Sequence, residues 1–132
     1  MNLKGRVVSE GDAQGEAVVL DGAFSLIGDF EASTGILTAK GHPLMGQSIA
    51  GKILVFTTGK GGTIAPFIAY EAKAAGKAPA AFLCDKADPI LVESALVSGI
   101  PLLDRLEPGP VNKAIQTGQK VRIAGNQVTV EN

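Results

Sequence analysis

The sequence contains few of the side chains on which metal and acid–base enzymes rely. Among 132 residues there is one histidine, one cysteine and no tryptophan. Histidine and cysteine are common metal ligands, and histidine is the side chain best suited to proton transfer near neutral pH. The composition therefore argues against a self-contained metalloenzyme, and the single Cys84 excludes an internal disulfide framework.

The sequence also lacks a large excess of positive or negative charge, and it has no long apolar run. The formal net charge is −1 and like charges do not cluster, which argues against nucleic acid or an anionic membrane surface as a partner. Apolar runs such as residues 78–84 are far shorter than the ~20 residues of a membrane helix, and residues 1–5 offer no apolar stretch for a signal peptide. We therefore expect a cytoplasmic protein without membrane partners, folded as a single domain over residues 1–132.

Glycine, by contrast, is abundant, with 17 residues, and it divides the first half of the chain into short segments. Apolar and polar residues alternate between turn signals such as Asp21-Gly22, which is typical of β-strands. We predict strands over residues 6–9, 16–20, 24–28 and 35–38, with a polar loop over 29–34. This half should form a β-rich shell.

The pattern changes at residues 53–56, a continuous apolar run that predicts a central strand covered on both faces. Apolar residues then recur at helical spacing from Ile64 until Gly76. Thr63 suits the N-cap of this helix, and Pro66 suits its first turn. The chain thus runs from a buried strand through a glycine-rich turn into a helix.

The same unit follows again. Residues 80–84 predict a second buried strand, and Asp88-Pro89 is a typical helix start, with aspartate as N-cap; Gly99 ends that helix before a third strand at 100–103. Residues 120–130 alternate in the manner of a half-exposed hairpin. The predicted fold is α/β, a β/β/α domain in which the β-rich shell packs on a small parallel sheet with flanking helices.

The turn over residues 57–63 is the best candidate for a binding site. Glycine-rich turns between a strand and a helix present backbone N–H groups that stabilise a carboxylate or phosphate, and a lysine can add a full charge. We therefore assign substrate binding to Gly59, Lys60, Gly61 and Gly62. The spacing does not match a nucleotide-binding P-loop. The alternative is that the glycines only permit a sharp turn.

Other polar residues have simpler explanations. His42 lies in a turn-like context, where a lone histidine is more often a surface or turn-stabilising group than a catalyst. Cys84 falls within a buried strand and should pack as a small apolar residue. Asp88 is explained as a helix cap, although the carboxyl end of a sheet strand is also where ligands gather. Asp104-Arg105 could be a local charge pair or a contact for a partner.

Several segments taken together resemble the swivel domain of the aconitase X family. They occur in the family's order over residues 4–105: 25–28 (SLIG), 34–36 (TGI), 41–43 (GHP), 46–52 (GQSIAGK), the glycine turn, 76–81 (GKAPAA) and 88–91 (DPIL). Each segment alone would be unremarkable. The resemblance implies a swivelling β/β/α domain that forms the small subunit of a two-subunit hydro-lyase and is inactive without the large subunit.

The resemblance also implies a chemistry. In archaeal relatives the pair dehydrates mevalonate 5-phosphate to trans-anhydromevalonate 5-phosphate, and in bacterial relatives the substrate is cis-3-hydroxy-L-proline. An iron–sulfur cluster held by cysteines of the large subunit polarises the leaving hydroxyl, and a serine of the swivel turn removes the proton. The small subunit closes over that cluster, so this chain is expected to form a heterodimer and to bind no metal itself.

This sequence departs from the family at the catalytic serine. Relatives commonly have Gly-Lys/Arg-Gly-Ser-Ser/Thr in the turn, whereas Gly62 stands at the first serine position and Pro66 replaces a later serine. Thr63 is the only hydroxyl at the matching positions and is our candidate for the catalytic base. Its alternative role is that of an ordinary N-cap. A subunit that only shapes the pocket is a further alternative.

Two other classes of function remain possible from the residues alone. A phosphohistidine-type swivelling carrier would need a histidine on a mobile loop, and His42 is the only one available. A non-catalytic module could use the glycine turn to bind a small anion without a partner.

Overall fold

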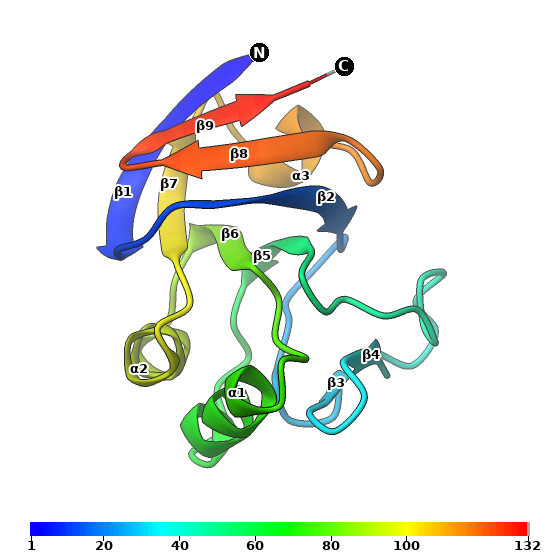
Figure 1. The fold of residues 1–132 in the computed structure, drawn as a ribbon. Coiled ribbons are helices and arrows are strands. Elements are labelled where there is room, and N and C mark those ends of the chain that lie inside the picture. Colours follow the sequence, from blue (N-terminus) through cyan, green and yellow to red (C-terminus); the bar gives the residue numbers. More distant parts are fainter. Residues whose placement is uncertain (132) are drawn as a thin grey trace.

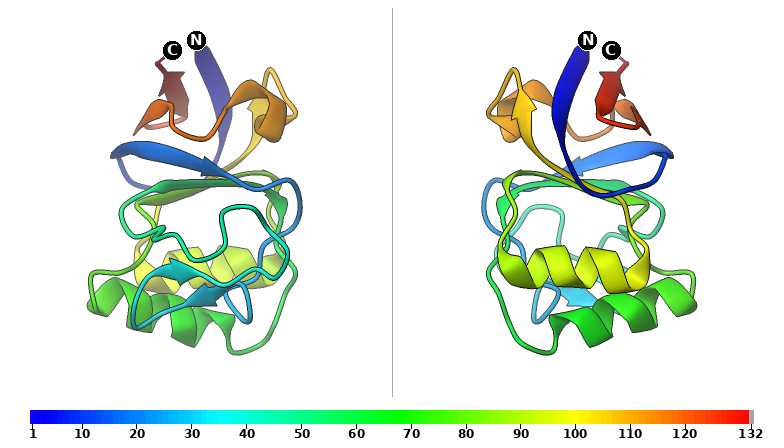
Figure 2. Two further views of the ribbon diagram at one scale, coloured as in Figure 1. Left: turned by 90° about the vertical axis from the view of Figure 1, so that its right-hand side faces the viewer. Right: turned by 90° about the vertical axis from the view of Figure 1, so that its left-hand side faces the viewer.

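Seven strands form a closed barrel in the computed structural model, which describes residues 1–131 (Figure 1). Their order around the barrel is β1-β7-β6-β5-β2-β8-β9. The strands are β1 (Asn2–Ser9), β2 (Ala13–Val19), β5 (Ile53–Thr58), β6 (Ala81–Lys86), β7 (Leu102–Glu107), β8 (Lys120–Ala124) and β9 (Gln127–Val130). The first and last strands pair, so the two termini lie close together at one end of the molecule (Figures 1 and 2).

The parallel strands β5, β6 and β7 separate two apolar cores. Successive side chains of a strand point to opposite faces, so Ile53 and Val55 fill the barrel while Leu54 and Phe56 face the helices. All four side chains are fully buried. The prediction of a central strand covered on both faces is therefore confirmed.

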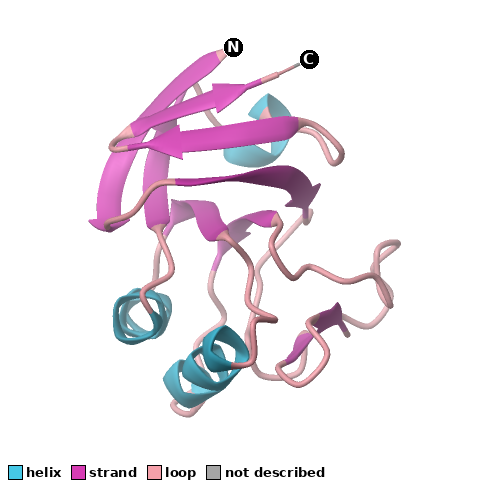
Figure 3. Cartoon of the chain, in the orientation of Figure 1, coloured by secondary structure: helices cyan, strands magenta, loops and turns pink. Residues whose placement is uncertain are grey.

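Two helices cover the outer face of the parallel strands. α1 (Ala65–Ala74) and α2 (Pro89–Ser98) run side by side beneath the barrel (Figures 2 and 3), while the short α3 (Val111–Ala114) packs elsewhere, with Val111 in the barrel core. Ala69, Ala72 and Ala95 are fully buried, which lets the helices approach the sheet closely. No helix within residues 1–131 is long and apolar enough to cross a membrane.

The segment between β2 and β5 differs from the prediction. Residues 24–28 do not form a strand: Phe24 makes only an isolated bridge with Gly59, and residues 26–28 form a turn. The Ser25 N–H donates to Asp29 Oδ2 at 3.0 Å and the Ile27 N–H donates to Ser25 Oγ at 3.0 Å. Side chains thus take donors that a strand would use in a ladder. Part of the predicted polar loop instead forms β3 (Phe30–Glu31), which pairs with β4 (Ile36–Leu37).

Most of the second half follows the prediction, with longer strands. α1 ends just before Gly76, Asp88 caps α2, Gly99 ends α2 in the left-handed conformation, and β8 and β9 form the expected hairpin. The layering needs a correction. The β-rich shell does not pack on the parallel sheet as a separate layer, because β1 pairs with β7 and β2 pairs with β5, which joins both parts into one barrel.

Candidate functional site

The glycine turn connects β5 to α1 at the carboxyl end of the parallel strands, where ligands of α/β sheets commonly bind. Its base is anchored to a distant segment, since the Phe24 N–H donates to the Thr58 carbonyl at 2.9 Å and the Lys60 N–H donates to the Phe24 carbonyl at 3.0 Å. Gly61 and Gly62 have φ values of 81° and 104°. These two positions favour glycine because other residues rarely adopt positive φ.

The turn presents consecutive backbone donors. Within residues 1–131, the N–H groups of Gly61, Gly62, Thr63 and Ile64 donate no hydrogen bond, and Gly62, Thr63 and Ile64 are exposed. The positive end of the α1 dipole lies at the same place. Free N–H groups at a helix start stabilise an anion, so the geometry agrees with the anion site expected from the sequence.

Lys60 is not a free positive charge. Its Nζ lies 2.8 Å from Asp29 Oδ2, and the Asp29 side chain is largely buried while that of Lys60 is half exposed. The same carboxylate oxygen accepts the Ser25 N–H. Lys60 therefore helps to fix the turn against the β2–β5 segment, and substrate binding by its ammonium group stays a prediction.

Thr63 does not cap α1, so the N-cap interpretation was wrong. The helix begins at Ala65, with Ile64 in the N-cap position and no side-chain cap. The Ala65 N–H donates to the Gly62 carbonyl at 3.0 Å, and this tight turn moves the N-cap position by one residue, from Thr63 to Ile64. In the described part of the chain the exposed Thr63 hydroxyl makes no hydrogen bond, so no structural role accounts for it, and its role as a base stays a prediction.

Two glycines of the turn are needed for packing. A Cβ added to Gly59 would lie 1.8 Å from Asp88 Oδ1, and one added to Gly62 would lie 2.4 Å from Ile27 Cδ1. Gly62 also has a positive φ. In this conformation a serine at position 62, which the family resemblance would lead one to expect, does not fit unless the backbone or Ile27 moves. Gly59 likewise serves the fold, whatever it contributes to binding.

Ser25 is a second hydroxyl beside the turn that sequence reasoning missed. Its Oγ donates to the Gly61 carbonyl at 3.3 Å and accepts the Ile27 N–H, so it is held against the turn. The two contacting residues are 36 positions apart, which hides the contact from local patterns. The only signal was that residues 25–28 form one of the segments shared with the family.

The single histidine lies beside Lys60. A shallow pocket of about 350 Å³ is lined by His42, Lys60, Asp29 and Lys40, among others. His42 Nδ1 accepts the Leu44 N–H at 3.1 Å, which confirms its turn-stabilising role. The fold thus gathers polar groups from two distant segments next to the glycine turn.

The turn between β6 and α2 is closed by two carboxylates. Asp88 Oδ2 accepts the Ile90 N–H at 3.1 Å, and Asp104 Oδ2 accepts the Ala87 N–H at 3.0 Å. The fully buried Asp104 also accepts two hydrogen bonds of 2.8 Å from Arg6. Burial alone would raise the pKa of Asp104, but the bonds from Arg6 and Ala87 outweigh it and keep that pKa below its usual value.

These contacts bear on the roles of Asp88 and Asp104, for which the sequence allowed more than one interpretation. Asp104 pairs with Arg6 of the neighbouring strand β1 and not with Arg105, so its carboxylate has a structural role, while a partner contact by the exposed Arg105 stays a prediction. Asp88 is confirmed as the cap of α2. Its other oxygen, Oδ1, is buried against Gly59 and has no hydrogen-bond partner within residues 1–131.

The described residues do not fit an iron–sulfur cluster. Burial, with help from the carboxylates of Asp104 and Asp85, raises the pKa of Cys84 to about 12, so its sulfur stays a protonated thiol inside the core. Across residues 1–131, no three histidine, cysteine, aspartate or glutamate side chains come together as metal ligands. The prediction that Cys84 belongs to the core is confirmed.

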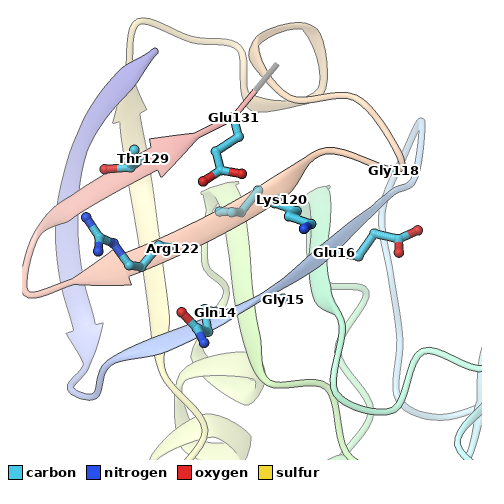
Figure 4. Close-up of a pocket in the computed structure, with 9 residues that line it drawn as sticks. Gln14, Gly15, Glu16, Gly118, Lys120, Arg122, Thr129 and Glu131 are labelled. Atoms are coloured by element: carbon cyan, nitrogen blue, oxygen red, sulfur yellow. The ribbon is translucent and has the colours of Figure 1, made fainter.

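A pocket larger than the one beside Lys60 lies elsewhere. Its volume is about 600 Å³, and it is formed by outward-facing side chains of β2 and β8 together with the end of β9 (Figure 4). Glu16 and Glu131 balance Lys120 and Arg122 there, and none of the lining residues belongs to the glycine turn. This polar outer face of the barrel lacks the convergent donors of the turn, and we base no function on it.

Comparison with known proteins places this arrangement in a family. The family model described as "Aconitase X swivel domain" matches residues 2–132. This chain belongs to the aconitase X swivel-domain family. The swivel domain is 39% identical over 131 residues to the phosphomevalonate dehydratase small subunit of Methanocella arvoryzae, covering 99% of this chain and 98% of the relative. The small subunit from Thermococcus gammatolerans is 40% identical, with 99% and 97% covered.

Solved structures give the same result. The swivel domain superposes on the crystal structure of holo-form aconitase X from Thermococcus kodakaraensis with a TM-score of 0.92 and 36% identity, covering 100% of this chain and 99% of the other. A solution structure of a UPF0107 protein has a TM-score of 0.90, at 29% identity and full coverage of both chains. The resemblance inferred from the ordered segments is confirmed.

Proposed function

We propose that this swivel domain is the small subunit of a two-subunit hydro-lyase that dehydrates mevalonate 5-phosphate to trans-anhydromevalonate 5-phosphate. The relatives with 39–40% identity carry the name phosphomevalonate dehydratase small subunit and align over nearly their whole length. The observation that carries the proposal within this chain is the open turn from Gly61 to Ile64, because its free N–H groups suit an anionic substrate.

The chemistry requires a second chain. Among the described residues, the turn is bordered by donors, a lysine paired with Asp29, and the hydroxyls of Thr63 and Ser25. None of these groups polarises a leaving hydroxyl. We assign that task to an iron–sulfur cluster held by the large subunit, which would supply a Lewis acid. The swivel domain then contributes anion binding and exclusion of water when it closes over the partner's site.

Thr63 is the proposed base that removes the proton next to the substrate carboxylate. A free threonine hydroxyl is a very weak base, so the step needs stabilisation of the alkoxide. The N–H groups of Gly61, Gly62 and Ile64 lie around it in the chain and have no other partner among residues 1–131, so they are available for that stabilisation. The absence of a capping role for Thr63 supports this assignment.

The test is the assembled enzyme. The chain is co-expressed with its large subunit, the cluster is loaded, and turnover is measured on mevalonate 5-phosphate and on cis-3-hydroxy-L-proline. We expect activity on the phosphorylated substrate and none from the isolated chain. Turnover of only the hydroxyproline would replace the substrate assignment, and a loaded complex inert on both would refute the proposal.

The role of Thr63 is tested in the same complex. Thr63→Ala should lower kcat by at least ~100-fold, which is the lower range for loss of a general base, whereas Thr63→Ser should retain most of the activity. Thr129→Ala is the matched control, because Thr129 lies on the outer face of the barrel away from the turn. Full turnover by Thr63→Ala would place the base elsewhere, with Ser25 as the next residue to replace.

A further inference from the structure

Helix α1 exposes three large apolar side chains on one side. The exposed fractions are 55% for Ile64, 75% for Phe67 and 62% for Tyr70. Residues three apart on a helix lie on neighbouring positions of one face. The opposite side of α1 is buried against the sheet through Ala65, Ala69 and Ala72. We call the exposed set, Ile64, Phe67 and Tyr70, the α1 stripe.

The α1 stripe holds the aromatic residues that the core does not use. The chain has five phenylalanines and one tyrosine. Phe24, Phe56 and Phe82 pack together in the core, with ring centroids 5.4 to 6.5 Å apart, and Phe30 is also buried. The other two aromatics are Phe67 and Tyr70. Exposed aromatic side chains are enriched at protein interfaces and often dominate their binding energy.

We infer that the α1 stripe is the surface on which the large subunit docks, an inference that rests on the proposed function. Ile64 follows Thr63 directly and belongs to the four residues with free N–H groups. A chain that completes the site at the turn must therefore approach Ile64, and the stripe continues from it along α1. A second copy of this chain on the stripe would cover the turn and add no cluster.

The second helix provides a matched control surface. Leu96 and Val97 of α2 are 56% and 52% exposed, so they are smaller than Phe67 and Tyr70 but are likewise apolar side chains that are mostly exposed. Both helices start from the same edge of the parallel strands. Leu96 and Val97 lie in the last turn of α2, at the end of the helix away from that edge, whereas the stripe begins at the glycine turn. They are apolar surface without contact with the proposed site.

The experiment compares two double variants by calorimetric titration of the large subunit: Phe67→Ser with Tyr70→Ser, and Leu96→Ser with Val97→Ser. All four side chains are mostly exposed, so both variants should fold, which circular dichroism and thermal unfolding check. The stripe variant should weaken binding at least ~30-fold, as expected for loss of interface hot spots, and the α2 variant by less than ~3-fold.

Each result decides the inference. Unchanged binding of a folded stripe variant, or equal weakening by both variants, would overturn it even if the wild-type complex is an active dehydratase. A wild-type chain that binds no large subunit would refute both the inference and the proposed function. Light scattering of the isolated chain over a concentration series tests whether the chain associates with itself. Self-association that the stripe variant abolishes, with large-subunit binding intact, would assign the stripe to a second copy and overturn the inference.

Discussion

Two turns at the carboxyl edge of the parallel strands each connect a strand to a helix, but they differ in whether their backbone N–H groups are hydrogen-bonded. Both leave a buried strand and enter a ten-residue helix with a proline near its start. The β6–α2 turn is closed, because Asp88 and Asp104 accept its N–H groups. The β5–α1 turn is open, because within residues 1–131 its four N–H groups from Gly61 to Ile64 have no acceptor.

The difference agrees with a structural role for the β6–α2 turn and with the anion-binding role proposed for the β5–α1 turn. Carboxylates at the α2 start satisfy the donors from within the chain, so a ligand gains nothing there. At the start of α1 no group among residues 1–131 accepts the N–H groups from Gly61 to Ile64, so a ligand or another chain would have to supply the acceptor. The two turns are also coupled, since Asp88 of the closed turn packs against Gly59 of the open turn and Thr58 Oγ1 donates to the Lys86 carbonyl at 2.7 Å.

The contact between Gly59 and Asp88, which couples the two turns, should not tolerate one added methyl group. Gly59→Ala would force a Cβ against Asp88 Oδ1 and should lower the free energy of unfolding by about 3 kcal/mol, the upper range for overpacking. Urea unfolding of the wild type and the variant measures this difference in the free energy of unfolding. In an Asp88→Ala background the carboxylate is absent, so the same change should cost much less. An equal cost in both backgrounds would contradict the coupling.

The closed turn should also depend on the buried carboxylate. Asp104→Asn weakens the bonds from Arg6 and from the Ala87 N–H and should cost about 2 kcal/mol at neutral pH. The folded-state pKa of Asp104 lies below its unfolded value, so its contribution is present above about pH 4 and is lost as pH falls through the folded pKa. Unfolding measured from pH 7 to pH 3 should therefore bring wild type and variant closer together at acid pH.

The helix caps give a direct contrast between the turns. Asp88→Ala removes the acceptor of the Ile90 N–H and should cost about 1 kcal/mol, the usual value for an N-cap. Thr63→Ala should change the stability of the isolated chain by less than about 0.5 kcal/mol, because Thr63 caps nothing. A comparable cost for both would mean that Thr63 does contribute to the start of α1.

The smallest expected effect is ligand binding by the isolated chain. Titration with inorganic phosphate, followed by amide NMR, should shift the N–H signals from Gly61 to Ile64, with a Kd of roughly millimolar because the large subunit is absent. The signals of Ala87 and Ile90 should not move, since their N–H groups are already bonded. Equal shifts at both turns would remove the distinction between open and closed.

Local patterns predicted the elements that depend on neighbouring residues. The apolar run at 53–56, the cap at Asp88 and the hairpin around Gly125 follow from burial, capping and turn chemistry, and all three are confirmed. The prediction failed at 24–28, where the Asp29 side chain accepts a backbone donor and bends the chain. It also failed at Thr63, because the Gly62 carbonyl accepts the Ala65 N–H and shifts the helix start.

The sequence by itself determined the order of strands and helices from β5 to β7, the buried character of β5 and the family, because periodicity, capping residues and shared segments are properties of short stretches. Only the tertiary structure decided that the strands close into one barrel, that Lys60 pairs with Asp29 and that Ser25 lies on the glycine turn. These contacts join residues tens of positions apart. Their free energy depends on a fold that no local pattern specifies.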